Sequence, residues 1–215
     1  MTSLDPFLLA TTIVDWEQPE VLSLARRLAR GKTLPVDVTR SCFEWVRDEV
    51  AHTVDHRLDK VTCSASEVLR ERTGFCYAKS HLLAALLRAN GIAAGFVYQR
   101  LALGNRAKAF CLHGLNAVWL PVVGWYRLDA RGNRDDLQAG FDPPLEQLPF
   151  SCVVPGEQLF SEIWAEPLRR VVEALKRYVT RPDFEANLPD ASDVDLKLER
   201  LGRIVAFRGT VQQCA

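Results

Sequence analysis

The stretch SASEVLRERTGFCYAKSHLLAALLRANGI, residues 64–92, decides the fold of this chain. One of its opening serines can cap a short helix, which a Thr-Gly pair at 73–74 then breaks. A second helix starts near Phe75 and Cys76 and stops at an Asn-Gly pair at 90–91. Because this second helix is apolar on more than one face, we expect it to be deeply buried.

Further helices are predicted before this stretch, and strands after it. Residues 19–30 and 36–51 each carry apolar side chains at helical spacing. Residues 95–103, 112–120 and 125–130 are short, rich in Val, Tyr, Trp and Leu, and separated by turn-prone residues. Strands joined by such short loops form an antiparallel meander. Helices first and strands later predict an α+β fold in which a helix packs on the sheet.

The chain has 215 residues, which is enough for one sizeable domain with additions. In its later part, residues 157–179 contain a helix with one apolar face, and 203–207 have the pattern of a strand. We expect residues 1–180 to form a single domain, with its core at 64–130. Residues 181–215 are then a C-terminal extension without an assigned role.

The composition excludes several classes of partner. Lys and Arg together number 27, and so do Asp and Glu, so the formal net charge is zero. That balance gives no electrostatic reason to expect nucleic acid or an anionic membrane as a partner. The N-terminal segment lacks the basic region and long apolar run of a signal peptide, and no stretch has the ~20 apolar residues that span a bilayer. We therefore expect a cytoplasmic location.

The cysteines are expected to be thiols, and most of them to be small buried apolar side chains. They are residues 42, 63, 76, 111, 152 and 214, with no CxxC pair among them. The nearest Cys–His pair, Cys111 and His113, does not make a zinc site by itself. A metal site would need Cys76, Cys111 and His113 to come together around one ion, and no spacing in the sequence indicates this. Neither a metal nor a cofactor is therefore predicted.

Cys76 differs from the other cysteines because it stands where a helix begins. A free thiol has a pKa of ~8.5 and is mostly protonated at neutral pH, whereas the thiolate is the nucleophile. A helix N-terminus favours negative charge, and its N–H groups can stabilise an oxyanion. A histidine must then pair with the thiolate, and a carboxylate must orient the histidine.

His113 and Asp129 are the candidates for these two roles. His113 opens the second predicted strand and Asp129 ends the third. The start of one strand lies beside the end of the next in an antiparallel hairpin, so we expect the two residues to be neighbours. Taken singly, each has a structural interpretation, as a buried histidine or as the start of a turn.

The order of these motifs resembles the transglutaminase-like core. The runs SASEVL, GFCYA and LLRANGI, then a strand with His113, then GWYRLD follow that family's order and spacing over about residues 64–130. The resemblance implies Cys76 as nucleophile, His113 as base and acid, and Asp129 as the orienting group. It also implies a papain-like fold, with the cysteine on a helix and the other two residues on an antiparallel sheet. The compact size is similar to that of small bacterial-type members.

Two positions depart from the family's pattern. The family's IPAR after the helix is IAAG at 92–95 here, and its HAW is His113, Gly114 and Leu115. These changes leave the three implied catalytic residues intact. They concern the surface that faces the substrate.

The implied chemistry is acyl transfer through a thioester on Cys76. The substrate would be a peptide, an amide or an acyl thioester. Transfer to water makes the chain a hydrolase (protease or amidase), and transfer to an amine makes it a transamidase. One alternative is an acyltransferase with a CoA or carrier-protein donor, although the Arg-Gly-Gly run of the arylamine N-acetyltransferases is missing. Another is a non-catalytic interaction module, which we would expect to lack one of the three residues.

The second donor to the oxyanion is not identified by the sequence. His52, Tyr98 and Gln99 are polar candidates without further support. His81 lies five residues after Cys76, so it should point to a different side of the helix and be structural or exposed. The acyl acceptor and the oligomeric state are also left open.

Overall fold

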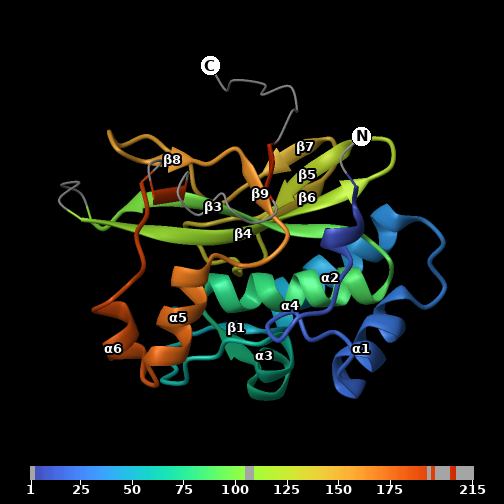
Figure 1. The fold of residues 1–215 in the computed structure, drawn as a ribbon, viewed down its shortest axis with the longest axis horizontal. Coiled ribbons are helices and arrows are strands. Elements are labelled where there is room, and N and C mark those ends of the chain that lie inside the picture. Colours follow the sequence, from blue (N-terminus) through green and yellow to red (C-terminus); the bar gives the residue numbers. More distant parts are fainter. Residues whose placement is uncertain (1–2, 105–108, 193–194, 197–203, 207–215) are drawn as a thin grey trace.

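A computed structural model describes residues 3–104, 109–192, 195–196 and 204–206 of this chain. Six strands form the main sheet, and the long helices lie together on one side of it (Figure 1). This arrangement confirms the α+β class. Within the described ranges, no helix is both long enough and apolar enough to cross a membrane.

The helices of the first half follow the predicted pattern. They are η1 (Asp5–Phe7), α1 (Pro19–Ala29), α2 (Pro35–Glu49), α3 (Ala65–Glu71) and α4 (Cys76–Ala89). A proline begins both α1 and α2, where a missing N–H costs no hydrogen bond. The Ser64 side chain caps α3 by accepting a hydrogen bond from the Glu67 N–H. Every residue of α4 up to Arg88 is buried, as its apolar sequence predicts.

The main sheet contains the predicted antiparallel meander. Its strands are β3 (Ala94–Ala102), β4 (Phe110–Leu120), β5 (Gly124–Leu128), β8 (Gln158–Leu159), β9 (Glu162–Trp164) and β10 (Ile204–Ala206). The order β10-β9-β3-β4-β5 places β4 near one edge, with β8 also paired to β3. A tight turn joins β4 to β5, where Leu120 is paired with Gly124.

The central helix α4 packs directly on β3 and β4 (Figure 1). Gly114 makes the closest approach possible, because a Cβ at this position would lie 2.9 Å from Cδ1 of Tyr77. The buried Asn116 amide donates to the Ser80 carbonyl at 3.0 Å and to the Gly95 carbonyl at 3.2 Å. One side chain of β4 thus joins the helix to the neighbouring strand.

Two short pairs of strands lie outside the main sheet. They are the parallel pair β1 (Ala51–His52) with β2 (Thr73–Gly74) and the antiparallel pair β6 (Gly140–Asp142) with β7 (Leu145–Gln147). The first pair joins the end of α2 to the turn before α4 and places His52 opposite Gly74. The start of α4 is therefore anchored to a segment about twenty residues earlier.

The helix expected within residues 157–179 is shorter than that range. It is α5 (Arg169–Arg177), which begins after Pro167, and the residues before the proline supply β8 and β9 instead. A last short helix, α6 (Arg181–Glu185), follows, and its Phe184 ring lies 4.4 Å from the Phe75 ring. Cys214 lies outside the described residues.

Candidate active site

The local chain path fixes Cys76 as the first residue of α4. Arg72 ends α3 in the left-handed conformation, with φ of 55°. The Thr62 hydroxyl donates to the Thr73 carbonyl at 2.9 Å, which holds the turn that follows. Phe75, at the N-cap of α4, supplies no side-chain cap, so the partial positive charge of the helix start faces Cys76. The thiol residue is 8% exposed.

His113 and Asp129 meet at the open end of the β4–β5 hairpin. Nε2 of His113 lies 2.5 Å from Oδ2 of Asp129. The histidine is the fourth residue of β4 and not its first, because the strand already begins at Phe110; the aspartate directly follows β5. Both residues are buried, and the carboxylate residue is only 1% exposed.

The surroundings of His113 favour its charged form. Burial by itself lowers the pKa of an imidazole, because the imidazolium loses hydration. The charge of Asp129 and its hydrogen bond, together with a charge interaction and a hydrogen bond with Cys76, outweigh burial and raise the pKa of His113 to about 10. Since Nε2 is engaged by Asp129, Nδ1 is the ring nitrogen left for the thiol.

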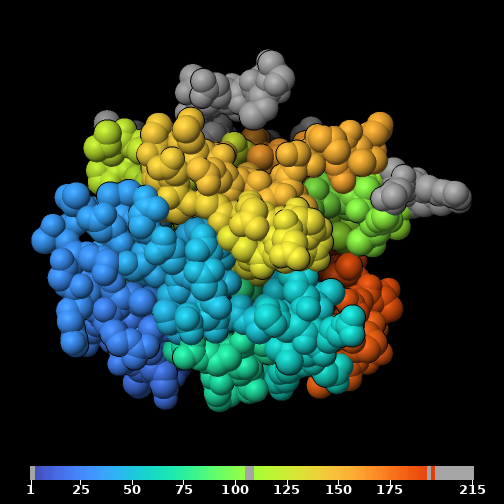
Figure 2. Space-filling view, turned by 180° about the vertical axis from the view of Figure 1, so that it is seen from behind, coloured from blue at the N-terminus to red at the C-terminus, as the bar shows by residue number. Residues whose placement is uncertain are grey.

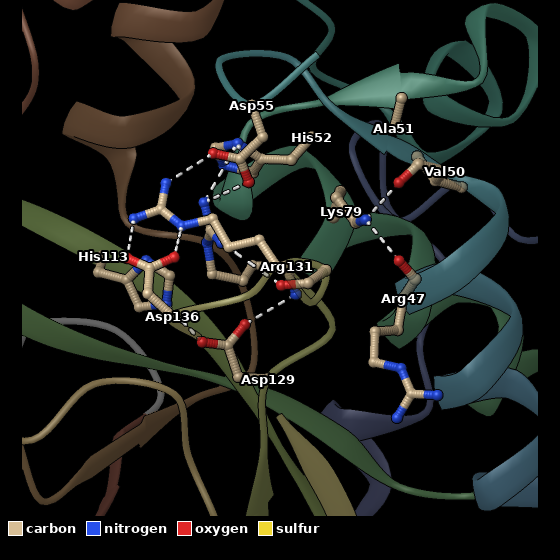
Figure 3. Close-up of polar contacts among 12 residues, drawn as sticks. Arg47, Val50, Ala51, His52, Asp55, Lys79, His113, Asp129, Arg131 and Asp136 are labelled. Carbon is tan, nitrogen blue, oxygen red and sulfur yellow. Dashed lines mark hydrogen bonds and ion pairs between the residues drawn. The ribbon is translucent and has the colours of Figure 1, made fainter. Parts of the chain in front are cut away.

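A buried arginine supports the carboxylate from behind (Figure 3). The second oxygen of Asp129, Oδ1, accepts the backbone N–H of Arg131 at 2.9 Å. The Arg131 guanidinium in turn lies 2.8 Å from Oδ2 of Asp55, and Arg134 binds the other oxygen of Asp55 at 3.2 Å. The loop after β5 is thereby joined to the segment after β1, and the two lie side by side on the molecule (Figure 2).

His52 contacts both members of the Arg131–Asp55 ion pair, and its Nδ1 lies 3.5 Å from Oδ2 of Asp55. Arg131 donates to its Nδ1 at 3.4 Å, and the imidazole ring lies 6.2 Å from the ring of Phe75, the residue before Cys76. Burial and the nearby charge of Arg131 hold the pKa of His52 well below its ordinary value of 6.5. The ring is therefore neutral at physiological pH.

Lys79 is a second buried cation, one turn after Cys76 (Figure 3). Its Nζ donates to the carbonyls of Arg47, at 3.2 Å, and of Val50, both at the end of α2. The last carbonyls of a helix have no partner within it, so this lysine caps α2 from the side. Burial lowers the pKa of Lys79 to about 7, although the charge of Asp129 acts in the opposite direction.

The segment around Phe150 covers the histidine. The Phe150 ring packs edge-on against the His113 ring with centroids 4.8 Å apart, and the Arg131 guanidinium lies 5.6 Å from the Phe150 ring. Gln99 is directly opposite His113 in the β3–β4 register. Its Nε2 donates to the Phe150 carbonyl at 3.0 Å, which holds the covering segment in place.

The remaining candidates from the sequence have structural partners. The Nδ1 of His81 lies 2.7 Å from the Cys63 carbonyl, and the residue is fully buried, so it is structural and not exposed. The Tyr98 hydroxyl accepts the Leu168 N–H at 3.0 Å on β3. Neither contact involves Cys76.

The other described cysteines are also free thiols. Burial raises the pKa of Cys42 to about 12, of Cys63 to about 11 and of Cys111 to about 12. These thiols stay protonated at neutral pH and are weak nucleophiles. Among the described residues, no three His, Cys, Asp or Glu side chains are grouped so that they could hold a metal ion.

The sequence did not point to Asp55, Arg131 or Phe150. The Asp55–Arg131 ion pair joins residues that are 76 positions apart, and no periodic pattern connects two irregular segments. The one signal available was position: Arg131 comes two residues after Asp129, where a backbone N–H readily bonds a preceding carboxylate.

Comparison with known proteins gives a family and several structural relatives. A family model described as the transglutaminase-like superfamily matches residues 22–130, just over half of the chain. A comparison with curated proteins found no match. Solved structures with similarity include a "putative cysteine protease" from Cytophaga hutchinsonii, with 21% identity and a TM-score of 0.47 over 60% of this chain and 42% of that one. The periplasmic domain of TgpA from Pseudomonas aeruginosa has 23% identity and a TM-score of 0.45 over 58% and 45%.

This chain spans less than half the length of either of these structures. The matched family region contains α4 and the β3–β5 meander, and it ends one residue after Asp129. By this match, the chain belongs to the transglutaminase-like superfamily.

Proposed function

We propose that this chain is a cysteine-nucleophile enzyme that breaks or transfers amide or ester bonds through a thioester on Cys76. The observation that carries the proposal is the continuous series of contacts from Cys76 to His113 and from His113 to Asp129. Membership of the transglutaminase-like superfamily agrees with it. In this proposal the substrate is a peptide or another acyl compound, and residues 1–180 form the catalytic domain.

Each residue has a role that follows from its surroundings. His113, held in its charged form by Asp129, pairs with the Cys76 thiolate. The thiolate attacks the carbonyl carbon, and backbone N–H groups at the start of α4 stabilise the oxyanion. His113 then gives its proton to the leaving group and later takes one from the acceptor. Asp129 keeps Nε2 engaged, so that Nδ1 faces the thiol.

The test is the reactivity of the thiol. Iodoacetamide labelling at pH 7, followed by peptide mapping, should show Cys76 alkylated faster than Cys42, Cys63 or Cys111. His113→Ala should slow the alkylation of Cys76 at least about tenfold, because it removes the cation that pairs with the thiolate. The labelling of Cys111 is the internal control and should not change.

Cys76→Ala should abolish turnover of amide and ester substrates and leave the melting temperature close to that of the wild type. If Cys76 reacts no faster than the other cysteines in the folded protein, the enzyme proposal fails. A non-catalytic interaction module would then take its place.

A further inference from the structure

Gln99 presents an unused hydrogen-bond acceptor beside the histidine. It is 1% exposed, and its register partner across β3 and β4 is His113. Residues directly opposite in an antiparallel pair project from the same face of the sheet, with Cβ atoms about 5 Å apart. The side chains of Gln99 and His113 therefore project from the same face, and the Gln99 amide binds the segment whose Phe150 ring packs on the imidazole.

The orientation of this amide is fixed by its neighbours. Nε2 donates to the Phe150 carbonyl at 3.0 Å and lies 3.7 Å from the sulfur of Cys152. A carbonyl oxygen only accepts, so the nitrogen of Gln99 must face Phe150 and the oxygen must point elsewhere. That oxygen, Oε1, is buried and has no hydrogen-bond partner among the described residues.

An unpaired buried acceptor costs free energy of folding, and the one on Gln99 belongs to the residue opposite His113 in the sheet. The ligand that would pair with Oε1 must carry a hydrogen-bond donor. It must also lie close to His113, the group that exchanges a proton with the leaving or attacking atom. The reacting atom meets both conditions when it carries a hydrogen besides the one that it exchanges with His113, as the nitrogen of an amide or a primary amine does.

We propose that Oε1 of Gln99 binds an N–H of the nitrogen that leaves or attacks at Cys76, and so selects amides that carry an N–H over esters and tertiary amides as acyl donors, and primary over secondary amines as acyl acceptors. The inference rests on the proposed function and names its substrate class. It makes Gln99 a group that contacts the reacting nitrogen.

The proton count explains the selection. When the Cys76 thiolate attacks a secondary amide, a C–S bond forms and the C–N bond breaks. The nitrogen keeps the electron pair of that bond and takes one proton from His113. It still carries its original hydrogen, which Gln99 can accept. The leaving oxygen of an ester and the leaving nitrogen of a tertiary amide have no such hydrogen. When a secondary amine attacks, its nitrogen gives its one hydrogen to His113 and has none left for Gln99.

The experiment uses the acetyl group, which is small enough that its transfer does not depend on specific binding of the acyl chain. p-Nitrophenyl acetate acetylates Cys76, and the acetyl-enzyme is then divided between water, methoxyamine and N,O-dimethylhydroxylamine. The two amines are weakly basic and differ by one N-methyl group. The rate with each amine is divided by the rate at which the same amine reacts with N,S-diacetylcysteine, a simple thioester in solution. This ratio corrects for the intrinsic reactivity of the amine.

In the wild type, the corrected rate with methoxyamine should exceed that with the N-methyl amine about tenfold. Gln99→Met keeps the volume and removes the acceptor, so it should lower the methoxyamine rate about tenfold and the rate with the N-methyl amine, which has no spare hydrogen, less than about twofold. Asn116→Leu is the matched control, since it removes another buried amide with an unpaired oxygen, on the side of β4 that faces α4. It should change all three rates alike.

The outcomes separate this inference from the proposed function. If the acetyl-enzyme forms but the wild type shows no preference beyond that in solution, the role of Gln99 is overturned and the thioester chemistry stands. The same holds if Gln99→Met lowers all rates equally. Because the wild-type ratio alone can refute the inference, the test does not depend on the variant's folding. If Cys76 is not acetylated at all, both the function and the inference fail.

Discussion

The ion pair between Arg131 and Asp55 shows how far support for the candidate site extends beyond its three central residues. Both side chains are mostly buried, and the arginine is the residue whose backbone N–H bonds Asp129. A buried pair contributes little net stability compared with apolar packing, but removing one partner leaves the other charge unpaired. The arginine is therefore a positioning residue, which acts on His113 through Asp129.

Arg131→Met should lower the free energy of unfolding by about 2 to 3 kcal/mol, because Asp55 would lose its buried cation and keep only its contacts with the more exposed Arg134 and with the His52 ring. The rate of Cys76 alkylation should fall as well, since the loop that holds Asp129 loses its anchor. Urea unfolding and iodoacetamide labelling measure the two effects.

The matched control is Asp136→Asn, which breaks an exposed pair with the neighbouring Arg134. It should leave both the unfolding midpoint and the labelling rate close to those of the wild type. Equal effects of the two variants would contradict a positioning role for Arg131.

The contact between α4 and β4 sets the distance between Cys76 and His113. Gly114 follows His113 and Tyr77 follows Cys76, and these two neighbours touch each other. The absence of a side chain at 114 lets the helix start lie close to the strand. The departure from the family's HAW pattern thus falls at a packing contact, where the family's alanine would meet Tyr77.

Gly114→Ala should destabilise the protein by about 1 to 3 kcal/mol and slow the alkylation of Cys76. The new Cβ would lie 2.9 Å from Cδ1 and 3.2 Å from Cα of Tyr77, and the second of these atoms belongs to the backbone and cannot rotate away. Thermal unfolding and thiol labelling would measure the change.

A double-mutant cycle tests the cause. In a Tyr77→Ala background the same glycine substitution should cost at least about 0.5 kcal/mol less, because part of the clash has been removed. Strictly additive costs would show that the strain arises elsewhere.

The sequence predicted these elements well where the spacing of apolar residues and the position of turn-forming residues indicate the same boundary. The Thr-Gly break and the apolar run placed α3 and α4 within one or two residues, and the three strands of the meander were assigned in order. The neighbourhood of His113 and Asp129 also followed, because hairpin geometry relates the two positions without further information.

The supporting residues could not be found in the same way. The contacts of Lys79 with the end of α2, and of Phe150 with His113, join segments whose relative position depends on the whole packing. A buried lysine in an apolar helix has no local signal that distinguishes it from an exposed one. The unpaired oxygen of Gln99 is a property of the folded neighbourhood and has no counterpart in composition or spacing.

Across the whole molecule, buried histidines make stability depend on acid pH. Burial lowers the pKa of His81 to about 4, although its hydrogen bond with the Cys63 carbonyl acts in the opposite direction, and His52 is shifted in the same direction. The unfolded chain takes up these protons below pH 6.5, whereas the folded chain does so only at lower pH. Stability is thus lost as the pH falls from about 6.5 towards 4.

His81→Asn should flatten this dependence. The asparagine amide can still donate to the Cys63 carbonyl but does not titrate, so the part that His81 contributes, about 3 kcal/mol between pH 6.5 and 4, should disappear. Urea unfolding of wild type and variant at several pH values in this range gives the two slopes. Parallel slopes would exclude His81 as the source.

The β4–β5 hairpin offers a position at which a label or a linker can be attached to this protein. The candidate active site lies at the open end of the hairpin, whereas the connecting turn lies beyond Leu120, about seven strand residues or roughly 23 Å from His113. Val122 in that turn is 98% exposed. A fluorophore, an affinity tag or a surface linker grafted there would project away from Cys76 and leave the approach to the thiol unobstructed.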